Sequence, residues 1–212
     1  MNVDAAADMT DEVRRGGPAY RLAKVLGVVL GPGLLVSVQP FIVALDQNGD
    51  GTLAARLAWA GVILLSCAAG PLAVREIWIL RGKVTSGRRV HERTERLAPL
   101  TVALGVVAAG VAALHFGHAP ADLRALVWAM LAGLLVTRVV TAVWKISVHT
   151  AVMAGTVAIL VLVVGPWAAL ATPLVPLVAW SRVRTRAHTL AQVVAGAIMG
   201  AGVAYSVFAA LT

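Results

Sequence analysis

The sequence predicts an all-α fold, a polytopic bundle of about six to seven transmembrane helices, from its composition and from its apolar runs. Of the 212 residues, 59% are hydrophobic and only 13% are charged, and the mean hydropathy is +0.85. Soluble domains carry about 25% charged residues, and a chain this apolar could not cover its surface with polar groups in water. The runs also reach the roughly 20 residues that a membrane helix needs. These observations exclude a soluble enzyme, a disordered chain and a free nucleic-acid-binding domain.

The chain divides into a short tail and one membrane domain. Residues 1–18 are polar and acidic, lack the pattern of a secretory signal peptide, and are expected to form a disordered cytosolic tail. The domain at 19–212 contains seven apolar segments, of which the first is interrupted at 31–33. The fifth and sixth are short and are expected to form an antiparallel pair hinged at 165–166, so six spans are also possible. The segments are 22–45, 53–80, 97–116, 123–144, 149–164, 167–183 and 188–211.

The connections between these segments divide the charges between two faces. Eighteen Lys and Arg against ten Asp and Glu give a net charge of +8. With seven spans, one face collects most basic residues, and the positive-inside rule places that face in the cytoplasm of a plasma-membrane protein. Basic residues that flank apolar spans fit anionic lipid head groups, so the expected partner is the bilayer and not nucleic acid. The basic face holds the tail, 81–96, Lys145 and 184–187, and the other face holds 46–52, 117–122 and 165–166.

No metal ion or other cofactor is expected. The turn at 46–51 reads DQNGDG and matches the first half of a calcium-binding loop, which needs a bidentate glutamate at position twelve. That position is Leu57, inside a predicted helix, so a polar turn is the better interpretation. The sequence offers no carboxylate cluster for magnesium and no cysteine and histidine set for zinc.

Three clusters of ionisable and hydroxyl residues lie at segment ends on the basic face. Ionisable residues at a bilayer are costly and by default indicate a functional site. Arginine forks fit phosphate oxygens, one histidine can attack phosphorus, and a second can protonate the leaving oxygen. The inventory favours metal-independent phosphoryl transfer. The clusters are Arg89 through Arg96, Ser147 with His149, and Ser181 and Arg182 with His188.

These clusters resemble the three signatures of the type-2 phosphatidic-acid-phosphatase family. Residues 181–192, SRVRTRAHTLAQ, are similar to the third signature, which is serine-arginine, five residues, histidine, three residues, aspartate. Residues 146–149, ISVH, are similar to the second, proline-serine-glycine-histidine. Arg89, followed after six residues by Arg96 and Leu97, is similar to the first, lysine, six residues, arginine-proline. The order and approximate spacing agree over residues 89–200.

The resemblance implies an integral membrane lipid phosphatase that works through a phosphohistidine. It makes His188 the nucleophile and His149 the acid and then the base. Gln192 stands where the family has aspartate, and its carbonyl oxygen can accept from the imidazole N–H and fix the tautomer without adding charge. Leu97 and Ile146 stand where the family signatures have proline, and Val148 stands where they have glycine. The residues that would hold the phosphoryl oxygens are Arg89, Arg96, Ser147 and Arg182, assisted by a backbone N–H near Val148.

We therefore expect a phosphatase acting on a lipid phosphate or diphosphate, either polyprenyl or phosphatidic-acid-like. The departures from the signatures leave two alternatives. One is a degenerate family member that binds an anionic lipid, and the other is a phosphotransferase that uses an acceptor other than water. A transporter is disfavoured, because the charges gather at one surface instead of the bilayer midplane. The sequence leaves the oligomeric state open.

Overall fold

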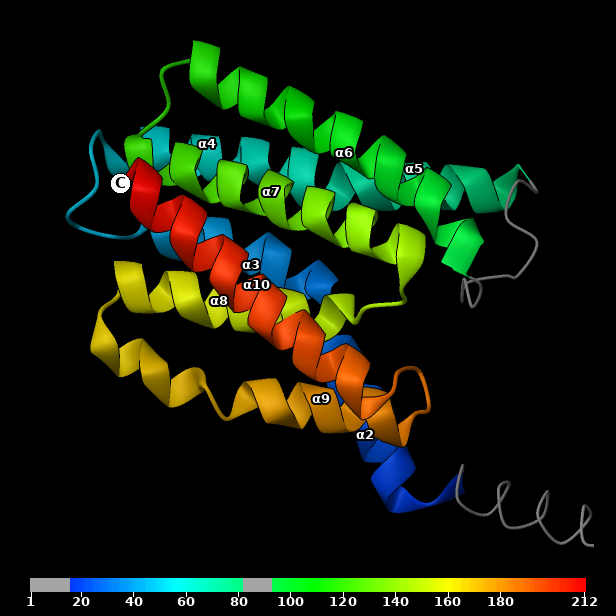
Figure 1. Cartoon of the computed structure of the whole chain (residues 1–212). Coiled ribbons are helices and arrows are strands. Elements are labelled where there is room, and N and C mark those ends of the chain that lie inside the picture. Colours follow the sequence, from blue (N-terminus) through cyan, green and yellow to red (C-terminus); the bar gives the residue numbers. More distant parts are fainter. Residues whose placement is uncertain (1–15, 82–92) are drawn as a thin grey trace, which may run out of the picture.

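The computed structural model describes residues 16–81 and 93–212 (Figure 1). Within these residues every regular element is a helix, which confirms the all-α class. The prediction of a tail at 1–18 falls mostly on residues 1–15, which lie outside the described residues. The helices, in chain order, are α2 (Pro18–Val29), α3 (Pro32–Ala44), α4 (Leu53–Ile63), the π-helical turn η1 (Leu64–Ala69), α5 (Gly70–Leu80), α6 (Arg93–Phe116), α7 (Ala121–Val143), α8 (Val148–Val163), the 3-10 helix η2 (Pro166–Ala171), α9 (Leu174–Arg184) and α10 (Leu190–Leu211).

The helix boundaries follow the seven predicted segments closely, and the expected interruption of the first segment separates α2 from α3. The two helices meet at an angle of 42°. Pro32 occupies the start of α3, where a missing N–H costs no hydrogen bond. Gly31, just before it, donates its N–H to Val28 O, 3.1 Å away, and not to Gly27 O as a continuous α-helix would require. The break therefore leaves the Gly27 carbonyl without its helical donor.

The predicted count of six to seven spans is not confirmed. Among the described residues, four helices are long and apolar enough to cross a bilayer, and a fifth is added if the bent pair α2–α3 counts as one span. α8 has 16 residues and α9 has 11, which is less than the roughly 20 that a perpendicular crossing needs. The long apolar helices support a membrane protein all the same. The four candidate spans are Leu53–Val74, Ala98–Phe116, Ala121–Val143 and Leu190–Leu211.

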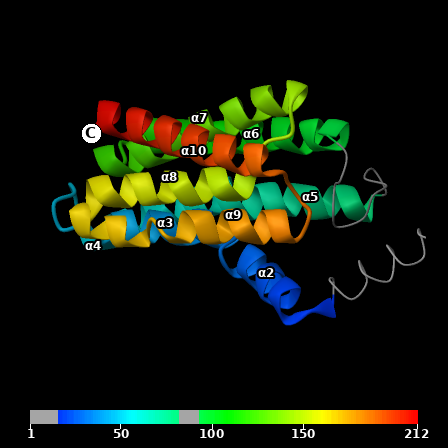
Figure 2. The same ribbon diagram turned by 60° about the horizontal axis from the view of Figure 1, so that its bottom comes forward.

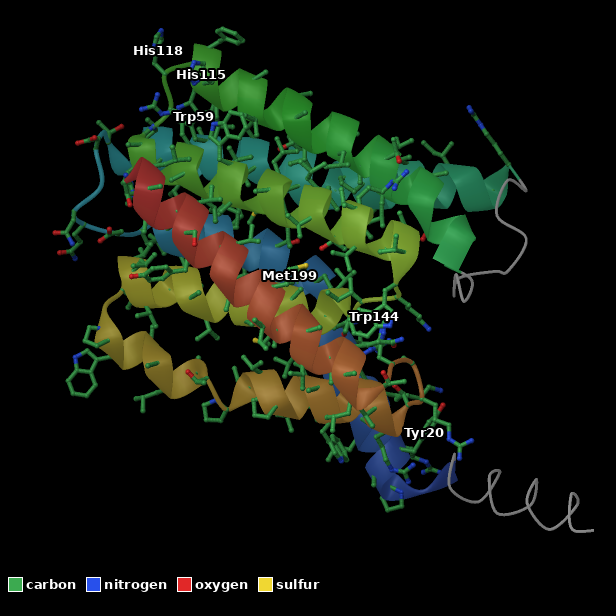
Figure 3. The ribbon with its side chains drawn as sticks, viewed as in Figure 1. Tyr20, Trp59, His115, His118, Trp144 and Met199 are labelled. Carbon is green, nitrogen blue, oxygen red and sulfur yellow. The ribbon has the colours of Figure 1, made fainter. Side chains whose placement is uncertain are left out.

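The described connections gather at two ends of the bundle. The start of α2, the α7–α8 connection and the α9–α10 connection lie at one end, which we call the basic end (Figure 1). The α3–α4 loop, the α6–α7 turn and the C-terminus lie at the other, the acidic end. Figure 3 shows Tyr20 and Trp144 toward the basic end and His115 and His118 at the acidic end. This arrangement matches the two faces expected from the sequence.

α8 and α10 pack closely enough to fix the basic end. A Cβ atom on Gly196 of α10 would lie 2.6 Å from Ser147 O, closer than real Cβ contacts allow. A Cβ on Gly200 would overlap the backbone of Ala151. Two glycines four residues apart give one helix a flat surface on which another helix can lie. Ser147 also donates its backbone N–H to Gln192 O over 3.3 Å, so the starts of α8 and α10 are held together.

α8 packs on α3 and on α9, and Figure 2 shows α2 leaving the bundle at an angle. α2 packs on α9. This places the α2 backbone beside α9, which carries Ser181 and Arg182.

Candidate functional site

Two of the three predicted clusters meet at the basic end. Ser147 and His149 lie at the start of α8, Ser181 and Arg182 lie in the last turns of α9, and His188 precedes α10. Neither Arg89 nor Arg96 of the first predicted cluster has a side chain among the described residues. Arg89 lies outside the described residues, and Arg96 lies in α6 with a side chain that is not described.

His188 is oriented by Gln192 through the cap of α10. Gln192 Oε1 accepts the Thr189 N–H over 3.2 Å and lies 3.1 Å from His188 Nδ1. Thr189 Oγ1 in turn accepts the Gln192 N–H, which completes a capping box. Because an amide oxygen only accepts, His188 Nδ1 must carry the proton in this contact, and Nε2 is then the basic nitrogen. The His188 side chain is largely buried, with 9% of its surface exposed.

His149 contacts the backbone of α2. Its Nε2 atom lies 3.2 Å from Gly27 O, the carbonyl that the α2–α3 break deprives of a helical donor. A carbonyl oxygen only accepts, so Nε2 is the protonated nitrogen of His149 in this contact. The two contacts therefore place a proton on Nδ1 of His188 and on Nε2 of His149, so different ring nitrogens of the two histidines are engaged. The free Nε2 lone pair of His188 suits a nucleophile, and His149 can serve as a general acid when its ring is in the imidazolium form, with both nitrogens protonated.

The end of α9 also contacts α2. Ser181 is fully buried and donates its hydroxyl hydrogen to Ala23 O over 2.6 Å. A Cβ on Gly27 would lie 3.0 Å from Arg182 Nη1 and 3.1 Å from Ser181 Oγ. Gly27 thus leaves room for the Arg182 guanidinium beside the α2 backbone. This contribution of α2 could not be predicted from the sequence, because backbone carbonyls carry no residue signature.

Ser147 has hydrogen-bonding capacity that the described residues do not use. It occupies the N-cap position of α8 with no cap bond from its side chain, and its Oγ atom is buried with no partner among the described residues. A serine at this position normally accepts an N–H of the first turn. A buried polar atom without a partner costs about 1–3 kcal/mol. The hydroxyl lies at the positive end of a helix and two residues from His149, which suits an anion.

The acidic end contains a polar cluster of another kind. Arg56 is 2% exposed and donates to Val43 O at 2.7 Å, Ala44 O at 2.9 Å and Asp50 O at 3.1 Å. It also forms an ion pair with Asp122, with 2.5 Å between Nη2 and Oδ2.

The loop at 46–51 is a polar turn that wraps this arginine. The Asn48 N–H donates to Asp46 Oδ1 over 3.2 Å. A Cβ atom on Gly49 would overlap the Arg56 guanidinium, so the glycine lets the loop close over the arginine. Within the described part of the chain, no group of three His, Cys, Asp or Glu side chains could hold a metal ion.

Comparison of the chain with protein-family models, curated proteins and solved structures finds no match. The fold and the site define a class: a helical membrane protein with a cluster of histidine, serine and arginine side chains at its basic end, of which Ser147, Ser181 and His188 are buried.

Proposed function

We propose that the protein is a metal-independent membrane phosphatase that hydrolyses a lipid phosphate or diphosphate through a phosphohistidine on His188. One observation carries the proposal. Two histidines, one bonded through Nδ1 to Gln192 and the other through Nε2 to Gly27 O, lie in one cluster with Arg182 and with Ser147, a buried hydroxyl that has no partner among the described residues. Such a set can bind a phosphoryl group, attack it and protonate what leaves.

In the first step, His188 Nε2 attacks the phosphorus atom. The N–P bond forms while the bond between phosphorus and the lipid oxygen breaks, and His149, in its imidazolium form, gives its Nε2 proton to that oxygen and becomes the neutral imidazole with its remaining proton on Nδ1. Gln192 holds the proton on His188 Nδ1 and keeps the attacking nitrogen in the productive tautomer. For His149 to act here, its ring must turn so that Nε2–H leaves the Gly27 carbonyl and contacts the leaving oxygen.

In the second step, water attacks the phosphohistidine. His149, now neutral at Nε2, removes a proton from the water, the N–P bond breaks, and inorganic phosphate leaves while His188 recovers its lone pair. Arg182, Ser147 and the first N–H groups of α8 stabilise the charge on the three equatorial oxygens in both steps. Arg89 and Arg96 are proposed to join them.

The proposed substrate is a lipid, because the cluster lies at one end of apolar helices where a head group would meet the chain. A polyprenyl phosphate and a phosphatidic-acid-like lipid both fit this chemistry. We also propose that the site faces the cytoplasm at the plasma membrane, because basic residues gather at that end.

Phosphate release from purified protein tests the proposal. The substrates are phosphatidic acid, a polyprenyl phosphate and a polyprenyl diphosphate, each offered in detergent micelles with a chelator present. We expect release by the wild type and by His115→Ala, which makes the same change on a histidine at the acidic end, and none by His188→Ala. Undiminished release by His188→Ala would refute the mechanism.

A second candidate is a protein that binds the lipid phosphate without turnover. It is favoured by the contacts of His149 and Ser181 with α2 carbonyls, which engage both side chains. It predicts lipid-phosphate binding that Arg96→Ala and Arg182→Ala weaken, with no phosphate released from any substrate. If the wild type transfers the phosphoryl group to another acceptor, analysis of products from radiolabelled lipid will show the phosphorylated acceptor in place of free phosphate.

A further inference from the structure

An apolar cavity of about 430 Å³, partly open to the outside of the bundle, lies between α3, α7, α8 and α10 and next to α5 and α6. Met199, labelled near the centre of the bundle in Figure 3, is one of its lining residues. The volume falls within the range of about 300–1,000 Å³ that is typical of small-molecule sites. Apolar side chains form most of the wall, and the polar exceptions include Gln39, Thr137 and Thr156.

The cavity begins beside the candidate site and runs along α8. Val148, Val152, Thr156 and Ile159 line it from one face of that helix, at spacings of three and four residues. Val148 is adjacent to His149, whose ring contacts α2 instead. Thr156 follows Val148 by eight residues, which is about 12 Å along the axis at 1.5 Å per residue. The cavity is therefore long enough to take an extended chain.

Gln39 presents an unused donor group in this cavity. Its side chain is 4% exposed, and its Oε1 atom accepts the Thr156 hydroxyl hydrogen over 3.1 Å. With the amide in this orientation, its Nε2 group is buried and has no partner among the described residues. A buried amide in this state costs about 1–3 kcal/mol, which a ligand oxygen would recover.

We infer that the cavity binds the hydrocarbon chain of a lipid, and that Gln39 Nε2 donates to an oxygen partway along that chain. The walls exclude a polar ligand, and a plain hydrocarbon would leave the Gln39 amide unsatisfied. The favoured chemical class is a long chain with a carbonyl or hydroxyl oxygen about 12 Å from its head-group end. The inference does not depend on phosphatase activity, because neither Gln39 nor Thr156 belongs to the candidate site.

The test compares two ligands that differ only in this oxygen. A radiolabelled saturated fatty acid and the matched keto fatty acid, with its carbonyl at mid-chain, are titrated against purified full-length protein in detergent. One hydrogen bond is worth about 1 kcal/mol, so we expect the keto acid to bind the wild type about fivefold more tightly. Gln39→Leu should remove this preference and leave the affinity for the saturated acid unchanged.

Two variants and one stability measurement make the result interpretable. Gln47→Leu, the same change at an exposed position in the polar turn, should keep the preference. His188→Ala should keep it too, so that a failure of the phosphatase proposal leaves this test intact. Gln39→Leu removes both the unsatisfied Nε2 group and the acceptor of the Thr156 hydroxyl, so the two effects should offset and the unfolding temperature should stay close to that of the wild type. Equal affinity of the two acids for the wild type, or a preference that survives in Gln39→Leu, would overturn the inference.

The chain could belong to the phosphate-bearing substrate or to a separate membrane lipid. A matched pair of alkyl phosphates, with and without the mid-chain carbonyl, separates these sources in wild-type protein. If the chain is that of the substrate, the keto compound has the higher kcat/KM, and Gln39→Leu removes the difference. If it belongs to a separate lipid, the two alkyl phosphates have the same kcat/KM while the fatty-acid preference remains.

Discussion

Both ends of the bundle bury polar side chains, but they use them differently. At the acidic end, Arg56 reaches three backbone carbonyls and a carboxylate that the fold itself supplies. At the basic end, Ser147 is just as deeply buried and makes no hydrogen bond through its hydroxyl to any described residue. A side chain whose partners all come from the fold stabilises the fold. A buried side chain whose donor or acceptor makes no hydrogen bond within the fold is a better candidate for contact with a ligand.

The largest expected effect on stability is at Arg56. Arg56→Met would leave the Asp122 carboxylate and the carbonyls of Val43 and Ala44 without their donor. Breaking a buried pair in this way costs about 3–5 kcal/mol. Thermal and denaturant unfolding in detergent should show this loss, whereas Arg81→Met, on an exposed arginine, should change the free energy of unfolding by less than about 0.5 kcal/mol. Equal losses in the two variants would show that Arg56 has no special structural role.

Ser147→Ala should show the opposite pattern. Phosphate release should fall by about 10- to 100-fold, because a donor to the phosphoryl oxygens is lost. The free energy of unfolding should stay constant or rise, since an unsatisfied buried hydroxyl is removed. Ser181→Ala is the matched contrast, because Ser181 already donates to Ala23 O, and it should cost about 1 kcal/mol of stability. A clear loss of stability in Ser147→Ala would mean that its hydroxyl has a structural partner.

Gln192 links a structural task to a catalytic one. Gln192→Leu removes the acceptor of the Thr189 N–H and of His188 Nδ1, and should cost about 1 kcal/mol of stability and tenfold or more in phosphate release. Gln192→Glu keeps an acceptor oxygen and should preserve both. The two variants are compared by unfolding and by steady-state release. Full activity in Gln192→Leu would exclude a positioning role for this residue.

The smallest effect is expected at Gly27. In Gly27→Ala the new Cβ must displace Arg182 or α2 by a few tenths of an ångström, so phosphate release should change a few-fold. The gain in helix propensity, about 1 kcal/mol, should roughly offset the cost in stability. Gly33→Ala has open space around its Cβ and should leave release unchanged. If the two variants release phosphate equally, the contact between α2 and Arg182 has no influence on activity.

The sequence predicted the helices better than it predicted their contacts. The apolar runs and the interruption at 31–33 located the segments, because both are local properties of the chain. Segment length did not give the number of spans, since α8 and α9 are too short to be counted by length alone. The ion pair of Arg56 and Asp122, 66 residues apart, was not predicted, because each residue alone looks like an ordinary loop-end charge.

The candidate site was predictable in its side chains and not in its backbone. The spacing of Ser147, His149, Arg182 and His188 placed them at one end, and the structure brings their helices together there. The contacts of the site with α2 backbone carbonyls could not be predicted, because a carbonyl group is present at every residue. The N-cap of α10 was also missed, although Thr189 with Gln192 three residues later is a capping-box pattern.

Trapping the phosphorylated enzyme tests the central claim most directly. Wild-type protein is mixed with lipid phosphate labelled with ³²P, quenched with base within a single turnover, and separated from lipid. We predict a label on the wild-type protein that is stable to base and labile to acid, as a phosphohistidine is, and that is absent from His188→Ala and retained in His115→Ala. A protein that releases phosphate without ever carrying this label, or that carries it in His188→Ala, would contradict the account.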